Sequence, residues 1–131
     1  MRNPAQAQFW RAEAESVPLV PIPYRAVFSA AQFATIRAGL VPYSMDDKWF
    51  VLFEDHHLLF FRSWTGRMIY RVSVELVPTG ARVIQAEVLD NPDLYERGSI
   101  EYEATLLSAF VRRLLLHEDV QYPARPGQLN N

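Results

Sequence analysis

Two acidic residues and a lysine stand directly before an apolar run, in the order Asp46-Asp47-Lys48. Asp46 and Lys48 are two positions apart, so they share a face if this segment is extended. In metal-dependent nucleases such an acid holds Mg²⁺, and the lysine stabilises charge or orients water. That pattern also needs an acid on a neighbouring upstream strand, but the nearest upstream acids, Glu13 and Glu15, fall in an expected helix. A polar turn at the sheet edge is therefore favoured over catalysis.

A second polar and aromatic cluster follows, in the order Arg62-Ser63-Trp64-Thr65-Gly66-Arg67. Its threonine–glycine pair is typical of a hairpin tip, since glycine accepts a positive φ. Two arginines beside an exposed tryptophan can bind a phosphate, a carboxylate or a planar ring. The alternative is that Trp64 belongs to the core and that Arg62 pairs with Asp46 or Asp47.

The histidines and the possible nucleophiles give weaker evidence for metal binding or catalysis. His56 and His57 stand beside two acids, and Zn²⁺ accepts both imidazole and carboxylate ligands. Neighbouring side chains on a strand point to opposite faces, however, so the two histidines cannot easily share one ion. Ser63 and Thr65 lack the surroundings of a nucleophile elbow, and no glycine-rich phosphate loop is present. We therefore predict no catalytic residue, no metal ligand and no cofactor.

The elements that must position these residues form an antiparallel meander. Residues 49–53 and 58–61 are continuous apolar runs separated by a polar turn, which indicates two strands that are apolar on both faces. Residues 67–76 and 81–89 alternate between apolar and polar positions around a turn, as half-solvated strands do. Four consecutive antiparallel strands are expected.

Helices are predicted on either side of this meander. The capping box Ser29–Gln32 begins a helix over about 30–39, and Ser99 can cap a final helix. Before them, the prolines of residues 17–24 impose an extended strap, which we expect across a surface or along a sheet edge. The predicted fold class is α+β, in the order α-β-β-β-β-α, with both helices on one face of the sheet.

The chain of 131 residues is predicted to form a single domain. An N-terminal arm and strap would cover residues 1–27, with a short helix at 6–16. The α+β core would cover 28–119, and a flexible tail 120–131.

The first hairpin has a second apolar face that no strong element covers. An apolar patch of this kind usually marks an interface. We expect it to be covered by the strap, by a second copy in a homodimer, or by another protein.

The composition of the chain argues against several classes of function. Half of the residues are hydrophobic, which supports a sizeable core. The net charge of −2 leaves no basic excess for nucleic-acid phosphates. No apolar run is long enough to span a bilayer, no signal-peptide stretch follows Met1, and there are no cysteines. We expect a cytoplasmic protein that binds neither membranes nor nucleic acid.

Part of the chain resembles a signature of small bacterial proteins. It comprises Met45-Asp46-Asp47-Lys48-Trp49-Phe50, then Leu59-Phe60-Phe61-Arg62-Ser63-Trp64-Thr65-Gly66 and Ile69-Tyr70. The resemblance implies a bacterial origin and draws attention to these residues, but it supplies no activity.

Two functions stay open at this point. The first is a binding or protein-interaction domain that recognises an anionic or planar group near the first hairpin. Its candidate residues are Asp46, Asp47, Lys48, Trp49, Arg62, Ser63, Trp64, Thr65 and Arg67. The alternative is a small hydrolase for a phosphorylated or nucleotide-like substrate, which would use Asp46 or Asp47 with Arg62 and Arg67.

Overall fold

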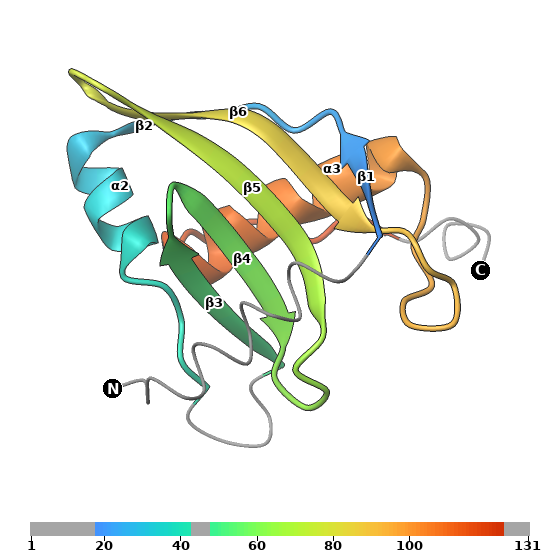
Figure 1. Cartoon of the computed structure of the whole chain (residues 1–131). Coiled ribbons are helices and arrows are strands. Elements are labelled where there is room, and N and C mark those ends of the chain that lie inside the picture. The colour runs from blue at the N-terminus through green and yellow to red at the C-terminus, as the bar shows by residue number, and fades with distance from the viewer. Residues whose placement is uncertain (1–17, 43–47, 125–131) are drawn as a thin grey trace.

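The computed structural model describes residues 18–42 and 48–124. It shows an α+β fold with one antiparallel sheet and two helices (Figure 1). The strands are β1 (Leu19–Ile22), β2 (Val27–Ser29), β3 (Trp49–Glu54), β4 (His57–Arg62), β5 (Met68–Val77) and β6 (Gly80–Leu89). The helices are α2 (Ala30–Arg37) and α3 (Ile100–Phe110), and α3 continues into a π-helical turn, η1 (Val111–Leu115). The helix predicted at 6–16 lies outside the described residues.

The sheet contains six strands, which corrects the prediction of four. Its order is β1-β6-β5-β4-β3, and β2 also pairs with β6. The additional strands come from the proline-rich strap and the residues after it, with Leu19 opposite Leu89 and Val27 opposite Arg82. Proline is tolerated in an edge strand because its missing N–H leaves no gap inside the sheet. The strap therefore lies along the sheet edge, one of the two positions expected for it.

The four strands of the predicted meander are all present and pair consecutively. Asp55 and His56 form the tight turn between β3 and β4, with φ of 53° and 64°. In a two-residue turn, positive φ at both positions matches the right-handed twist of the flanking strands. This turn fixes the register, so that Trp49 at the start of β3 lies opposite Arg62 at the end of β4.

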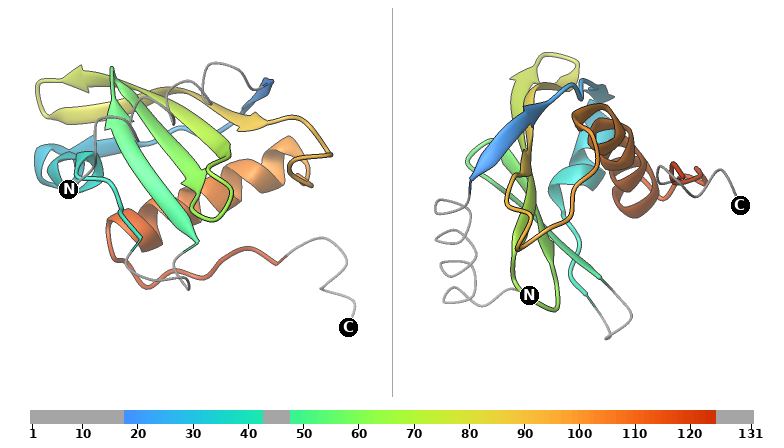
Figure 2. Two further views of the ribbon diagram at one scale, coloured as in Figure 1. Left: turned by 60° about the horizontal axis from the view of Figure 1, so that its bottom comes forward. Right: turned by 90° about the vertical axis from the view of Figure 1, so that its right-hand side faces the viewer.

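Both helices pack on the same face of the sheet (Figure 2). Phe33 of α2 and Leu107 of α3 share one core cluster with Phe60 and Tyr70 of the strands. Each helix begins as the sequence predicts: the Ser29 hydroxyl accepts the Gln32 N–H, and the Ser99 hydroxyl accepts the Tyr102 N–H. The sequence did not predict the π-helical turn, in which the Leu116 N–H donates to the Val111 carbonyl.

The opposite face of the first hairpin is buried. It holds a second apolar cluster of Phe50, Leu52, Leu59, Phe61 and Met68, whose side chains are 0–5% exposed. Leu19 of the strap packs against this cluster. The face that the sequence left without a cover is therefore buried, and the strap contributes to its cover through Leu19.

One further property concerns membranes. No helix in the described part of the chain is long and apolar enough to cross a bilayer.

Candidate functional site

The β3–β4 register places Lys48, Trp49 and Arg62 at one end of the first hairpin. Trp49 and Arg62 are directly opposite each other, and the Ser63 N–H donates to the Lys48 carbonyl at 2.9 Å. Cross-strand partners project from the same face of the sheet. The Arg62 guanidinium carbon consequently lies over the Trp49 ring, 5.1 Å from its centroid.

A tight turn follows Arg62 and carries Trp64 outwards. Its backbone is closed by two hydrogen bonds, from the Arg62 N–H to the Arg67 carbonyl and from the Gly66 N–H to the Arg62 carbonyl. Gly66 has a φ of 71°, as a hairpin tip of this kind requires. Trp64 is 69% exposed, so it does not belong to the core.

Trp49, in contrast, is a buried anchor that is only 8% exposed. Its ring centroid lies 4.8 Å from that of Phe110, 6.0 Å from that of Tyr70 and 6.2 Å from that of Phe60. Aromatic neighbours at these distances fix the orientation of a ring. Trp49 thus supports Arg62 from below and leaves little of its own ring for a ligand.

A buried carboxylate, Glu103, is hydrogen-bonded to Tyr70, one of the aromatic neighbours of Trp49. Glu103 is fully buried and accepts hydrogen bonds from Tyr70 (2.6 Å), Tyr95 (2.9 Å) and the Gly98 N–H (2.8 Å). Burial, and then the neighbouring Tyr95 and Glu103, raise the pKa of the Tyr70 phenol well above its usual range. Tyr70 therefore keeps its proton, and its O–H donates a hydrogen bond to Glu103.

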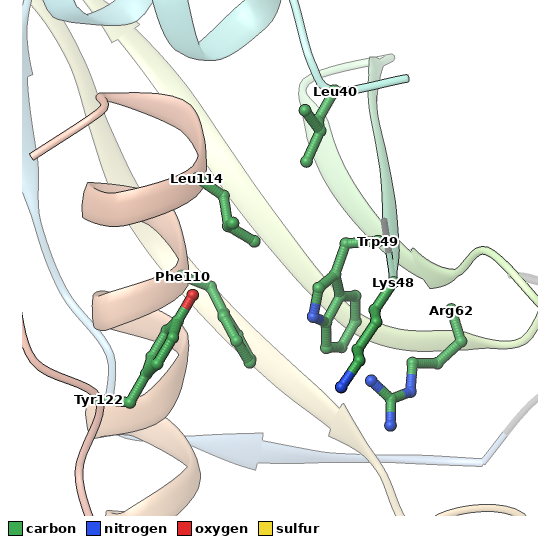
Figure 3. Close-up of a pocket in the computed structure, with 7 residues that line it drawn as sticks. All are labelled: Leu40, Lys48, Trp49, Arg62, Phe110, Leu114 and Tyr122. Carbon is green, nitrogen blue, oxygen red and sulfur yellow. The ribbon is translucent and has the colours of Figure 1, made fainter. Parts of the chain in front are cut away.

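Beside Trp49 lies a cavity of about 380 Å³, here called the inner recess (Figure 3). Its apolar wall consists of Leu40, Trp49, Phe110, Leu114 and Tyr122, and the side chains of Lys48 and Arg62 stand at its mouth. This volume is within the range of small-ligand sites, which are mostly apolar with a few polar groups for orientation.

Two more recesses, each of about 360 Å³, adjoin Arg62. The outer recess is lined by Lys48, Arg62, Trp64 and Thr65. The lateral recess is lined by Arg62, Thr65, Arg67, Ile69, Leu94, Tyr95 and Glu96. Arg62 is thus common to all three recesses, and Lys48 is common to the inner and outer ones.

Arg62 differs from those arginines of the fold that pair with a carboxylate. Arg71, Arg97 and Arg112 each pair with a carboxylate, at 2.8, 3.0 and 2.9 Å. Within residues 18–42 and 48–124, no carboxylate lies at salt-bridge distance from Arg62 or Lys48. Among the described residues, the inner recess is therefore lined by two cations and no carboxylate, an arrangement that suits an anion.

Most of the candidate residues from the sequence come together at this end of the hairpin. Lys48, Trp49, Arg62, Ser63, Trp64, Thr65 and Arg67 all lie here. Asp46 and Asp47 lie outside the described residues, and so does any pairing of Arg62 with them. His56 and His57 are at the other end of the hairpin, and the described residues contain no group of three potential metal ligands.

The sequence did not indicate four residues of the recess wall, which are Leu40, Phe110, Leu114 and Tyr122. Leu40 reaches the inner recess because its backbone N–H and carbonyl both pair with Val51 at the edge of β3. Phe110 is the last residue of α3 and Leu114 lies in the following turn η1, and both line the inner recess. Tyr122 lies against Phe110, with 5.4 Å between the ring centroids, and the Arg113 guanidinium lies 5.2 Å from the Tyr122 ring centroid.

Known proteins give no direct guide to this site. Neither a protein family, nor a curated protein, nor a solved structure matches the chain. The resemblance to a signature of small bacterial proteins therefore stays a prediction. The chemistry of the site follows from its own side chains.

The inner recess can be compared with what each chemistry would need. The described wall and mouth of the inner recess contain no carboxylate, imidazole or aliphatic hydroxyl that could act as a base or nucleophile. The hydrolase alternative needs Asp46 or Asp47, neither of which is described. What the described residues provide is a pair of cations above an apolar and aromatic wall.

Proposed function

We propose that this protein is a binding domain that holds an anionic group at Lys48 and Arg62, with the apolar or planar body of the ligand in the inner recess. One observation carries the proposal. The Arg62 guanidinium is stacked 5.1 Å from the Trp49 ring centroid, at the mouth of a cavity, with no carboxylate partner among the described residues.

The stacking suits Arg62 to recognise an anion. A guanidinium laid over an aromatic ring loses part of its freedom before any ligand arrives, and its N–H groups lie in one plane. Planar, fixed donors match the two oxygens of a carboxylate or phosphate. Lys48 adds a second positive charge, and its ammonium group can approach the anion from many directions because its side chain is flexible.

The recess wall suits an apolar group attached to that anion. Phe110, Leu114 and Leu40 are half-buried, so their exposed area is available to a ligand rather than committed to the core. Covering this area removes apolar surface from water and is favourable by about 25 cal/mol per Å². A ligand that combines the two features gains from both parts of the site.

Phenyl phosphate is a suitable first probe, because it joins a planar apolar group to an anion. We expect saturable binding in calorimetry, with weaker binding of inorganic phosphate and of neutral benzyl alcohol. Arg62→Ala should weaken phenyl phosphate by about tenfold, as expected for a hydrogen-bonded charge contact. Arg82→Ala is the matched control, because Arg82 is exposed and pairs with Glu75 far from the recess.

Two results would contradict the proposal. One is that none of the three probes binds saturably, while amide NMR signals near Trp49 remain unmoved. The other is that Arg62→Ala and Arg82→Ala weaken phenyl phosphate equally, because a general loss of positive charge would then explain the effect.

A further inference from the structure

We infer that the ligand is an extended segment of a partner protein, in which one acidic side chain contacts Lys48 and Arg62 while bulky apolar side chains two positions before and after it enter the inner and outer recesses. This inference rests on the proposed function and adds the class of ligand. It depends on where the two cations lie relative to the apolar surfaces.

The two cations belong to both the inner and the outer recess. Lys48 and Arg62 line each of them. The inner recess adds the apolar side chains of Phe110 and Leu114, and the outer recess adds Trp64, which is 69% exposed. A compact anion fills one recess, whereas a ligand with apolar groups on both sides of its charge fills both.

An extended peptide can present one charged and two apolar side chains to a single surface. Successive side chains of an extended chain point to opposite sides, and those two positions apart point to the same side, about 7 Å from one another. Three anchors that meet one surface therefore occupy every second position. The matching pattern is apolar-x-acid-x-apolar.

We expect the side chains of such a segment, and not backbone hydrogen bonds to β3, to hold it in place. β3 is an edge strand of the sheet, and edge strands often recruit a peptide by backbone pairing. Here Leu40 already pairs with Val51 in the middle of that edge, through hydrogen bonds of 3.0 and 2.9 Å. A docked segment consequently depends on its side-chain anchors, and its sequence pattern matters more than its strand propensity.

The partner is expected to be acidic at the contact. Arg62 adjoins all three recesses, and Lys48 lines the inner and outer ones, which contain no carboxylate among the described residues. Like charges across an interface are unfavourable, so a segment with lysine or arginine near its central acid is rejected.

The test uses capped five-residue peptides. The first has phenylalanine at both ends, alanine at positions two and four, and glutamate in the middle. Its matched controls replace glutamate by glutamine, replace both phenylalanines by alanine, or move the phenylalanines next to the glutamate. Affinity is measured by calorimetry, and the binding position by amide NMR shifts.

We expect the first peptide to bind at least about tenfold more tightly than each control peptide. It should also bind more tightly than phenyl phosphate, because it fills both recesses. Arg62→Gln and Trp64→Ala should each weaken it, whereas Arg82→Ala should not. Trp64 is largely exposed, so its removal tests the outer recess with little risk to the fold.

The inference and the proposed function fail in different ways. Phenyl phosphate that binds in an Arg62-dependent manner, together with a peptide that is no better than its controls, overturns the peptide inference and leaves the binding domain intact. If neither probe binds, both are overturned. If light scattering shows a dimer that Arg62→Gln converts to a monomer, the occupant is a second copy and the inference is wrong.

Discussion

Arg62 and Trp49 face each other across β3 and β4, with the guanidinium carbon 5.1 Å from the indole ring centroid. The indole is held from the other side by the Phe110 and Tyr70 rings. The charged group therefore rests on a rigid aromatic base that is part of the core. This relationship connects the stability of the fold to the position of the cation at the recess.

The two members of this pair should contribute very differently to stability. Arg62→Ala should lower the free energy of unfolding by no more than about 1 kcal/mol, the usual size of a partly exposed cation–π contact. Trp49→Ala should cost about 3–5 kcal/mol, because it empties a buried aromatic site. Urea unfolding followed by circular dichroism measures both. Equal effects of the two substitutions would mean that Arg62 is a structural residue.

Glu103 provides a second stability test, because one side chain satisfies three donors. Glu103→Leu should destabilise the protein by more than about 3 kcal/mol, since Tyr70, Tyr95 and the Gly98 N–H each lose an acceptor. Glu103→Gln should cost less than half as much. Its amide oxygen can accept from Gly98, and the two hydroxyl oxygens can accept from its NH₂ group.

Equilibrium unfolding in urea compares these two variants with the natural chain. Glu101→Gln is the control, because Glu101 lies two positions earlier in the same helix and is exposed. A leucine variant as stable as the glutamine variant would show that the buried hydrogen bonds are not needed for the fold.

Alkaline pH should destabilise the protein through its buried phenols. Burial raises the pKa of both Tyr24 and Tyr70 above the ordinary value of 10.0. Above about pH 10 the unfolded chain loses these protons while the folded chain keeps them, so the free energy of unfolding falls as pH rises. This stability is fully present below about pH 10. Each phenol contributes a slope of up to about 1.4 kcal/mol per pH unit.

Tyr70→Phe separates the two phenols. The variant should be less stable at neutral pH, because Glu103 loses a donor, but its stability should fall less steeply above about pH 10. Urea midpoints measured at a series of pH values give both slopes. Parallel curves for the variant and the natural chain would contradict a pKa raised at Tyr70.

The first hairpin and its polar end could be predicted from the sequence, because their determinants are local. Two apolar runs separated by a short polar turn leave one antiparallel register, and that register places Trp49 opposite Arg62. The strap on β6 could not be predicted in the same way. Its pairing depends on a free edge of a strand more than fifty positions later, for example Leu19 opposite Leu89.

The wall of the inner recess also needed the structure. Phe110 and Leu114 belong to an apolar helix stripe in the sequence, but the stripe does not say which part faces the core and which part lines a cavity. Tyr122 follows the π-helical turn, which adds one residue to a helical turn and has no clear sequence signature. Its contact with Phe110 therefore depends on a backbone change that the side-chain pattern does not reveal.

Gly39 precedes Leu40, and its backbone conformation lets Leu40 pair with Val51 beside the recess. Its φ is 73°, and an added Cβ would lie 2.3 Å from the Val51 carbonyl oxygen. Gly39→Ala should therefore cost more than the roughly 1–2 kcal/mol of a left-handed backbone alone, because the α2–β3 connection must also move away from β3.

Gly39→Asn separates the two causes. Asparagine tolerates positive φ but carries the same Cβ, so it should be nearly as destabilising as alanine. Ala38→Gly, at the preceding exposed position, should change stability by no more than about 1 kcal/mol. Urea unfolding measures all three variants, and phenyl phosphate affinity should fall in both Gly39 variants because Leu40 leaves the wall. An asparagine variant as stable as the natural chain would mean that φ alone, and not the approach to Val51, requires glycine here.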